Sequence, residues 1–180
     1  FLVIIIIFAL YVNIYNLFHN PLQRYKYFTN QSNLLVLIVS VMMLFKINNK
    51  TFKYLSFITL ISIVMTGIIY NVLLRTNITN TLEIIQNELT HTVIPIFYTL
   101  IYYIFNKTKL EYKEFYIGLI HPILYLIIFS IVGHFTNKYP YDFLNVKQYG
   151  YTQLLIITPS VIILIFIAIM LKKLTTNKDV

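Results

Sequence analysis

Cysteine is absent from this sequence, and charged residues are scarce. None of the 180 residues is a cysteine, so disulfide bonds and thiolate metal sites are excluded. Only 11% of the residues are charged, whereas an average soluble domain has roughly 25%. Such a chain has too few charged side chains to cover a water-exposed surface. Its length predicts a single domain, and its composition predicts that lipid surrounds this domain.

The hydrophobic residues lie in six long stretches. They make up 58% of the chain, which has a mean hydropathy of +0.74. A helix needs about 20 apolar residues to cross the hydrocarbon core of a bilayer. Stretches near this length lie at about residues 1–18, 29–46, 54–74, 89–106, 114–135 and 151–171. The first is longer than the h-region of a signal peptide and no small-residue cleavage site follows it, so we interpret it as a span too.

Polar segments with turn-forming residues separate the six stretches, such as HNPLQRYKY after the first and KINNKTFK after the second. Helices and closed barrels are the structures that satisfy their backbone hydrogen bonds inside lipid. The sequence lacks the alternating segments of about ten residues that form barrels. It therefore predicts an all-α fold: a polytopic membrane bundle of six transmembrane helices, forming one integral-membrane domain over residues 1–180.

Lysine and arginine are unevenly divided between the two sides of the predicted bundle. One side has nine, at positions 46, 50, 53, 107, 109, 113, 172, 173 and 178, and the other has five, at positions 24, 26, 75, 138 and 147. Because cytoplasmic joints carry the excess of these residues, we expect a multi-pass protein of the cell membrane with both termini in the cytoplasm. The net charge of +8 forms no basic stripe, so the expected partner is membrane lipid and not nucleic acid.

Polar residues gather at the predicted outer ends of the spans. Such groups near the membrane usually face the bundle interior or water. Because these ends lie at similar depth, we expect their side chains to line one outward-facing pocket. The residues are Thr29, Ser32 and Asn33 on the second span, Asn71 and Arg75 on the third, Asn87, Glu88 and His91 on the fourth, and His134 at the end of the fifth.

His91 lies one helical turn before Pro95, in the stretch NELTHTVIP. Proline has no N–H, so the carbonyl of His91 loses its helical partner and the helix is expected to bend there. Glu88 and Asn87 precede His91 by one turn, and either could hydrogen-bond the ring and fix its tautomer. The alternative is an interfacial histidine with one satisfied hydrogen bond.

Thr29 is the expected partner of His91. In KYFTNQSNLL it is placed as a helix N-cap, beside backbone N–H groups that the helix cannot use and that can hold a developing negative charge. A threonine hydroxyl becomes a nucleophile when a base such as neutral histidine removes its proton. Ser32 and Asn33, one turn further on, could donate hydrogen bonds to an oxyanion. Ordinary helix capping is the alternative role for Thr29.

Arg75 lies one turn after Asn71 at the outer end of the third span. Its guanidinium could bind the free carboxylate of a fatty substrate as a charge-assisted pair. The alternative is a cation that stabilises a helix C-terminus and anchors the span at the interface.

Four motifs, KYFTNQSNLL, TGIIYNVLLR, NELTHTVIP and YPYDFLNV, occur in order from the second span onward. In this combination the chain resembles bacterial relatives of the androgen-induced-protein family, which includes the androgen-dependent TFPI-regulating protein. The resemblance implies six spans and, from the animal members, an intramembrane hydrolase with a threonine nucleophile and a histidine. Thr29 and His91 occupy those positions. Fatty acid esters of hydroxy fatty acids are the implied substrates.

Non-enzymatic functions are the alternatives to a lipid ester hydrolase. A small transporter or lipid-binding protein would use the same outer pocket, although the chain shows no internal repeat and no glycine-rich break within a span. A purely structural subunit would leave the clustered polar groups unexplained. The hydrolase hypothesis requires Thr29 and His91 to lie within hydrogen-bond reach. Transport requires a polar path from the pocket past His121 to the cytoplasmic face.

No metal or organic cofactor is expected. His91, His134 and Asp142 are residue types that bind zinc, but no close ligand spacing supports such a site. His121, which precedes Pro122 in the fifth span, is interpreted as a packed, hydrogen-bonded interior histidine.

Overall fold

The structure is a computed structural model, and it describes residues 2–75, 79–106, 108, 110–150, 162, 166–168, 170 and 171. These residues form helices and turns and contain no strand, so the all-α prediction is confirmed for the described part of the chain. The elements are α1 (Leu2–Phe18), α2 (Pro21–Arg24), α3 (Phe28–Leu44), α4 (Lys50–Ile69), the π-helical turn η1 (Tyr70–Leu74), α5 (Thr81–Glu88), the π-helical turn η2 (Leu89–Val93), α6 (Ile94–Phe105), the 3₁₀ segment η3 (Tyr112–Leu119), α7 (Ile120–Thr136), the 3₁₀ turn η4 (Asp142–Leu144) and α8 (Val146–Tyr149).

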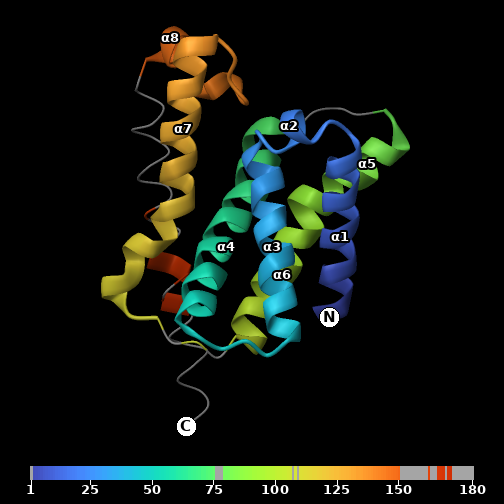
Figure 1. Ribbon diagram of the computed structural model, residues 1–180, viewed down its shortest axis with the longest axis vertical. Helices are drawn as coiled ribbons and strands as arrows, with labels where there is room; N and C mark the ends of the chain where they lie inside the picture. Colours follow the sequence, from blue (N-terminus) through green and yellow to red (C-terminus); the bar gives the residue numbers. More distant parts are fainter. Residues whose placement is uncertain are drawn as a thin grey trace.

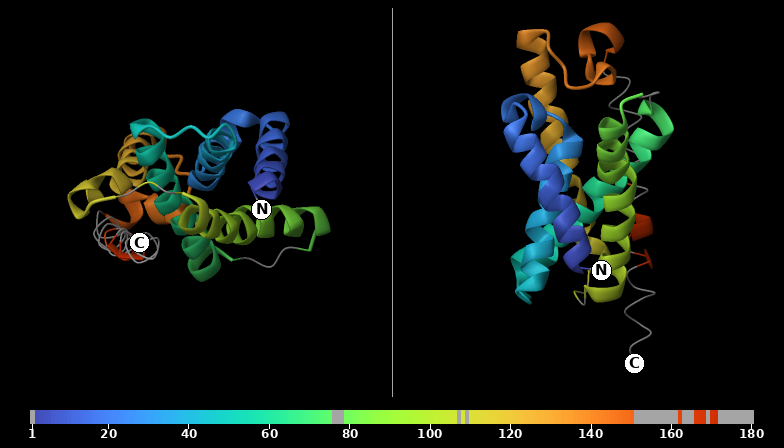
Figure 2. Two further views of the ribbon diagram at one scale, coloured as in Figure 1. Left: turned by 90° about the horizontal axis from the view of Figure 1, so that it is seen from below. Right: turned by 90° about the vertical axis from the view of Figure 1, so that its right-hand side faces the viewer.

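The long helices run roughly parallel to the long axis of the molecule (Figure 1). Helix α1 packs on α3, α3 on α4, α4 on α6, and α6 back on α1, so these four helices form a closed group. Helix α7 packs on α4, outside this group, as the view from below shows (Figure 2). The short helices α2, α5 and α8 all lie toward one end of the molecule. The site described below is built at that end.

Two of the helix starts are capped by asparagine. The side chain of Asn49 accepts a hydrogen bond from the N–H of Phe52 at 2.8 Å and begins α4. The side chain of Asn80 accepts from the N–H of Leu82 at 2.9 Å and begins α5. Each bond satisfies an N–H group that has no partner within its helix.

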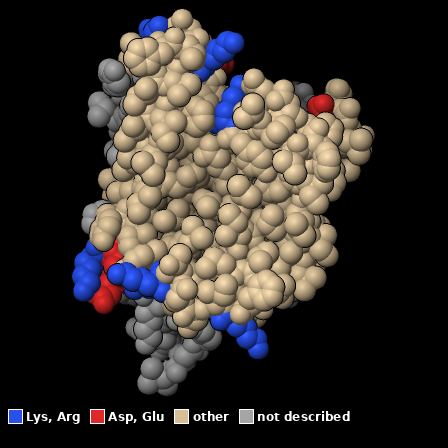
Figure 3. Space-filling view, viewed as in Figure 1, with Lys and Arg blue, Asp and Glu red and all other residues tan. Residues whose placement is uncertain are grey.

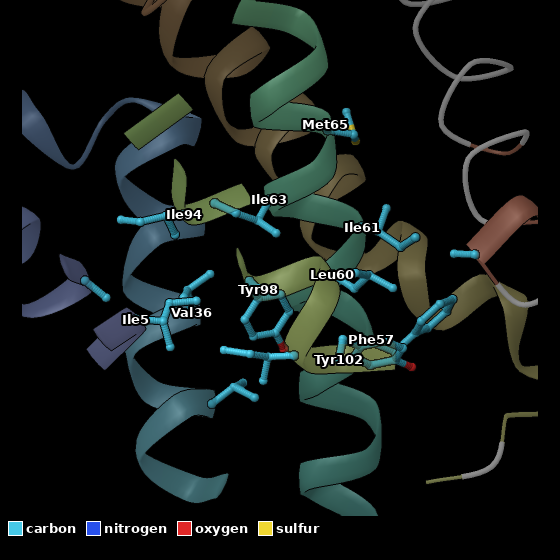
Figure 4. Packing of buried hydrophobic residues seen from close by; sticks show 14 of the residues in the cluster. Ile5, Val36, Phe57, Leu60, Ile61, Ile63, Met65, Ile94, Tyr98 and Tyr102 are labelled. Carbon is cyan, nitrogen blue, oxygen red and sulfur yellow. The ribbon is translucent and has the colours of Figure 1, made fainter. Parts of the chain in front are cut away.

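The core lies where the four packed helices meet (Figure 4). Ile5 of α1, Val36 of α3, Ile63 of α4 and Ile94 of α6 are fully buried there. Tyr98 of α6 is also fully buried, and its hydroxyl donates to the carbonyl of Ser56 at 3.0 Å. A buried hydroxyl without a partner is costly, so this hydrogen bond makes the tyrosine compatible with an apolar core.

Among the described residues, two helices are long and apolar enough to cross a membrane: Lys50–Val72, with 23 residues, and Tyr116–Thr136, with 21. Leu2–Phe18 and Phe28–Leu44 are apolar but shorter. Most of the expected sixth span, 151–171, lies outside the described residues. On the face shown in Figure 3, charged residues lie near the two ends of the molecule, and an uncharged belt separates them. Many large hydrophobic side chains are exposed to the surroundings, among them Ile127, Ile128 and Ile131 of α7.

Candidate functional site

Thr29 and His91 meet at the end of the bundle that carries α2 and α5. The Thr29 Oγ1 atom lies 3.3 Å from the His91 Nε2 atom, although 62 positions separate them in the chain. The distance meets the hydrogen-bond requirement that the hydrolase hypothesis sets for this pair. The predicted N-cap role is wrong, because Tyr27 is the N-cap of α3 and Thr29 is the second residue of the helix. Its N–H, which a helix start leaves without a helical partner, faces the Tyr141 hydroxyl at 3.5 Å.

The hydrogen bonds of His91 fix its tautomer. Its Nδ1 atom lies 3.0 Å from the carbonyl of Asn87, which can only accept. Nδ1 also lies 2.8 Å from the Thr90 hydroxyl, whose own hydrogen is donated to the carbonyl of Gln86 at 2.9 Å. The hydrogen of the neutral ring is therefore on Nδ1, and the lone pair of Nε2 faces Thr29. Asn87 and Glu88 were the two predicted partners of the ring. Asn87 contacts the ring, and it does so through its main-chain carbonyl.

Packing holds the imidazole in this orientation. The ring of Tyr70, in η1, stacks on that of His91 with centroids 3.8 Å apart and an angle of 17° between the planes. The carbonyl of His91, which loses its helical partner to Pro95, accepts a hydrogen bond from the Asn71 Nδ2 atom at 3.1 Å. Asn71 is thus a positioning residue, because it holds the turn that carries His91.

Arg75 and Glu88 do not take the roles predicted for them. The Arg75 Nη2 atom lies 2.6 Å from the Glu88 carboxylate, and Nη1 donates to the Asn71 side chain at 3.2 Å. The Arg75 side chain is 58% exposed and lines neither of the two cavities that Thr29 lines. Its charge is therefore already paired, and Glu88 is turned toward Arg75 rather than toward the His91 ring.

Ser32 and Asn33 are buried behind Thr29 and line neither of these cavities. The Asn33 Nδ2 atom donates to the carbonyl of Thr29 at 2.9 Å and to that of Thr90 at 3.3 Å, which ties α3 to η2. The Ser32 hydroxyl has no hydrogen-bond partner. The predicted positioning role therefore fits Asn33, whereas the geometry brings neither side chain to a place where an oxyanion would form.

Two cavities meet at Thr29. A polar cavity of about 370 Å³ is lined by residues of α2, α5 and η2, including Asn87, Thr90 and His91. A narrow apolar pocket of about 40 Å³ lies between α3, α4 and α7 and includes Phe28, Met65 and Leu126. Thr29, Tyr70, Leu74 and Tyr141 line both. The threonine hydroxyl thus lies at the junction of a polar space and an apolar one.

Sequence reasoning missed the role of Tyr141. Its hydroxyl lies 3.4 Å from Thr29 Oγ1, across 112 positions of the chain. Burial raises the pKa of Tyr141, an effect that its hydrogen bond with Thr29 opposes only in part, so the phenol remains a hydrogen-bond donor. The motif YPYDF contains this residue, but only the reversal of the chain after α7 brings it to Thr29.

The other singled-out histidines and Asp142 lie apart from Thr29. His121 is held by Ser62, 2.8 Å from its Nδ1 atom, and by the side-chain oxygen of Gln31, 3.1 Å from its Nε2 atom, which confirms the packed, hydrogen-bonded interior histidine. His134 and Asp142 are exposed. Within the part of the chain that the structure describes, no group of three histidine, cysteine, aspartate or glutamate residues could hold a metal ion.

Comparisons of the chain with protein-family models, with curated proteins and with solved structures found no match. The function proposed next is therefore based on the geometry of the site and on the motifs of the sequence.

Proposed function

We propose that this protein is a membrane-embedded lipid ester hydrolase in which Thr29 is the nucleophile and His91 is the base. The observation that carries the proposal is the 3.3 Å contact between Thr29 Oγ1 and the unprotonated Nε2 atom of His91. A hydroxyl next to a base whose other nitrogen is fixed by a third group is the arrangement that nucleophilic catalysis uses. The motif resemblance to the androgen-induced-protein family supports the same pair.

The reaction has two halves. In the first, the Thr29 oxygen attacks the ester carbonyl carbon while its proton passes to His91 Nε2. The tetrahedral intermediate collapses, the bond to the alcohol oxygen breaks, and the alcohol leaves with the proton from Nε2. In the second half, a water molecule attacks the acyl-threonine as His91 takes its proton. The carboxylic acid leaves, and the proton returns to the Thr29 oxygen.

Tyr141 and the start of α3 are placed to stabilise the oxyanion of these intermediates. The Tyr141 hydroxyl lies 3.4 Å from the attacking oxygen, and the N–H of Thr29 belongs to the first turn of the helix. Preorganised donors at the position where charge develops typically contribute the largest part of such catalysis. These two donors replace Ser32 and Asn33 in that role.

The cavities at Thr29 suit an amphiphilic ester. The apolar lining beside Phe28 and Met65 favours the acyl side of the substrate, although a pocket of about 40 Å³ admits only the short part of the chain next to the ester. The polar part of the substrate occupies the cavity beside Asn87 and His91. No metal or organic cofactor is needed for this chemistry. The apolar lining of the pocket favours an acyl lipid, and fatty acid esters of hydroxy fatty acids follow from the family resemblance alone.

We further propose that the chain is a multi-pass protein of the cell membrane with six spans and both termini in the cytoplasm. The two long apolar helices, the exposed apolar side chains and the uncharged belt in Figure 3 support membrane insertion. The distribution of lysine and arginine supports the orientation. Thr29 and His91 then lie near the outer surface, where lipid substrates can enter from the bilayer.

The test is covalent labelling of the detergent-purified protein by a lipid-like fluorophosphonate. We expect the wild type to be labelled and both Thr29→Ala and His91→Ala to lose the label. Thr99→Ala is the matched control, because Thr99 lies on α6 about two turns after His91 and lines neither of the cavities at Thr29. A folded wild type that is not labelled, or equal labelling of Thr29→Ala, would overturn the proposal.

The transporter alternative requires a polar path through His121. Both ring nitrogens of this histidine are occupied by Ser62 and Gln31, and it lines neither cavity at Thr29. The contacts of His121 therefore favour the hydrolase over the transporter.

A further inference from the structure

The polar cavity at Thr29 contains an arginine without an acidic partner. Arg24, the last residue of α2, is half-buried and lines this cavity together with Thr29 and His91. Its guanidinium carbon lies 5.1 Å from the centre of the Tyr15 ring, a cation–π contact that involves no acceptor atom. Among the described residues no carboxylate forms an ion pair with Arg24, in contrast to Arg75 with Glu88 and Lys53 with Glu114.

The backbone holds Arg24 in place. Its carbonyl accepts hydrogen bonds from the Asn30 side chain at 2.8 Å and from the N–H of Tyr27 at 3.2 Å. The guanidinium carbon lies over the Tyr15 ring, so less side-chain freedom is lost when a ligand binds. Arg24 is therefore a preorganised cation, and its N–H donors are left for a ligand.

One acidic residue, Glu83 of α5, also lines the cavity. Glu83 is exposed to solvent and pairs with none of the described cations, so water and salt screen its charge. Half-buried Arg24 is screened less. The fixed charge that a ligand in this cavity meets is therefore positive.

We infer that Arg24 is the anion-binding residue of this cavity, and that it holds a carboxylate or a phosphate of the molecule whose ester Thr29 attacks. Guanidinium groups bind both anions through paired N–H donors. Because Arg24 and Thr29 line the same cavity, one molecule can present its anion to Arg24 and its ester to Thr29. This last step rests on the proposed hydrolase function, whereas the binding of an anion by Arg24 does not.

The binding experiment uses the full chain carrying Thr29→Ala, in a neutral detergent, so that no ligand is hydrolysed. The probes are oleate, oleoyl lysophosphatidate and the uncharged monooleoylglycerol. We expect both anionic probes to bind more tightly than the neutral one, and Arg24→Gln to weaken the anionic probes about tenfold or more. Binding of monooleoylglycerol should not change. A preference for oleate or for lysophosphatidate identifies the anion as carboxylate or phosphate.

Lys26→Gln is the matched control. It also removes one positive charge, two residues after Arg24, but the Lys26 side chain does not line the cavity. Arg24→Lys should keep part of the preference, since the charge remains but the paired donors are lost. If Arg24→Gln does not fold, the salt dependence of oleate binding to the Thr29→Ala chain decides the question. Binding that is independent of salt, or equal weakening by Lys26→Gln and Arg24→Gln, overturns the inference.

Hydrolysis of matched anionic and neutral esters by the otherwise wild-type chain separates this inference from the proposed function. Under the inference, Arg24→Gln raises KM for the anionic ester about tenfold and leaves KM for the neutral ester unchanged. Hydrolysis of both esters with no effect of Arg24→Gln overturns the substrate assignment but keeps the hydrolase. Anion binding that depends on Arg24, without hydrolysis of any ester, overturns the hydrolase but keeps the anion site.

Discussion

Tyr141 contributes a hydroxyl to the site and an aromatic ring to the packing around it. We expect Tyr141→Phe to lower kcat about 100-fold, the usual cost of losing one oxyanion donor. The new ring can still stack on Phe143, as Tyr141 does with centroids 5.2 Å apart, so KM and the melting temperature should change little. Steady-state kinetics with a neutral ester and a thermal melt measure these quantities.

Tyr139→Phe is the control for this change. The Tyr139 hydroxyl is buried and has no hydrogen-bond partner, so its removal should leave kcat unaltered. Full kcat in Tyr141→Phe would show that Tyr141 does not stabilise the oxyanion, and an equal loss in Tyr139→Phe would show that the effect is structural.

Single residues were predictable from the sequence where a local rule acts on them. The loss of a helical partner for the His91 carbonyl follows from Pro95 alone, and the structure adds that Asn71 supplies the replacement. The pairing of Arg75 with Glu88 was not predictable, because it depends on how two helices approach each other. Tyr141 was missed for the same reason, since only the folded chain brings it to Thr29.

At the scale of helices, Gly67 allows α4 to approach the turn that carries His91. A Cβ atom on this residue would lie 3.1 Å from Pro95 Cβ and 3.3 Å from the His91 carbonyl oxygen. Both distances are tighter than ordinary van der Waals contacts, so the added methyl group would move the turn by a few tenths of an ångström. The contact between Thr29 Oγ1 and His91 Nε2 would lengthen as a result.

We therefore expect Gly67→Ala to reduce the rate of fluorophosphonate labelling by at least tenfold, while stability changes by no more than about 2 kcal/mol. Alanine gains about 1 kcal/mol of helix propensity over glycine, which offsets part of an overpacking cost of about 1–3 kcal/mol. Fluorophosphonate labelling rates and thermal melts measure the two effects. Ile68→Ala, at an exposed neighbour on the same helix, should label normally. Normal labelling of Gly67→Ala would mean that the site tolerates this displacement.

Hydrophobic runs predicted the helices but not their irregular turns. The expected spans 54–74 and 89–106 correspond to α4 with η1 and to η2 with α6. Each contains a π-helical turn, and these turns bring Tyr70 and His91 into contact. A repeat of 3.6 residues cannot reveal such turns, because contacts between helices select them.

At the scale of the whole molecule, the expected gathering of polar helix ends is confirmed for Thr29, Asn71 and His91. The joint between α3 and α4 lies at the opposite end, and Lys46 in this joint and Lys50 at the start of α4 belong to the more basic set (Figure 1). The sequence could predict this division because a helical span must end near a membrane surface. The packing order of the helices was not predictable, because many apolar faces are interchangeable.

The proposed orientation can be tested because the chain has no cysteine, so any introduced thiol is the only one. Gln23 of α2 and Asn48 between α3 and α4 are both exposed and lie near opposite ends of the molecule. In intact spheroplasts, a membrane-impermeant maleimide should label Gln23→Cys at once and Asn48→Cys only after the membrane is permeabilised. This expectation follows from the proposed orientation, in which the lysines beside Asn48 keep that joint in the cytoplasm. The reverse pattern would place Thr29 and His91 at the cytoplasmic surface, and labelling of both variants without permeabilisation would contradict a membrane-spanning bundle.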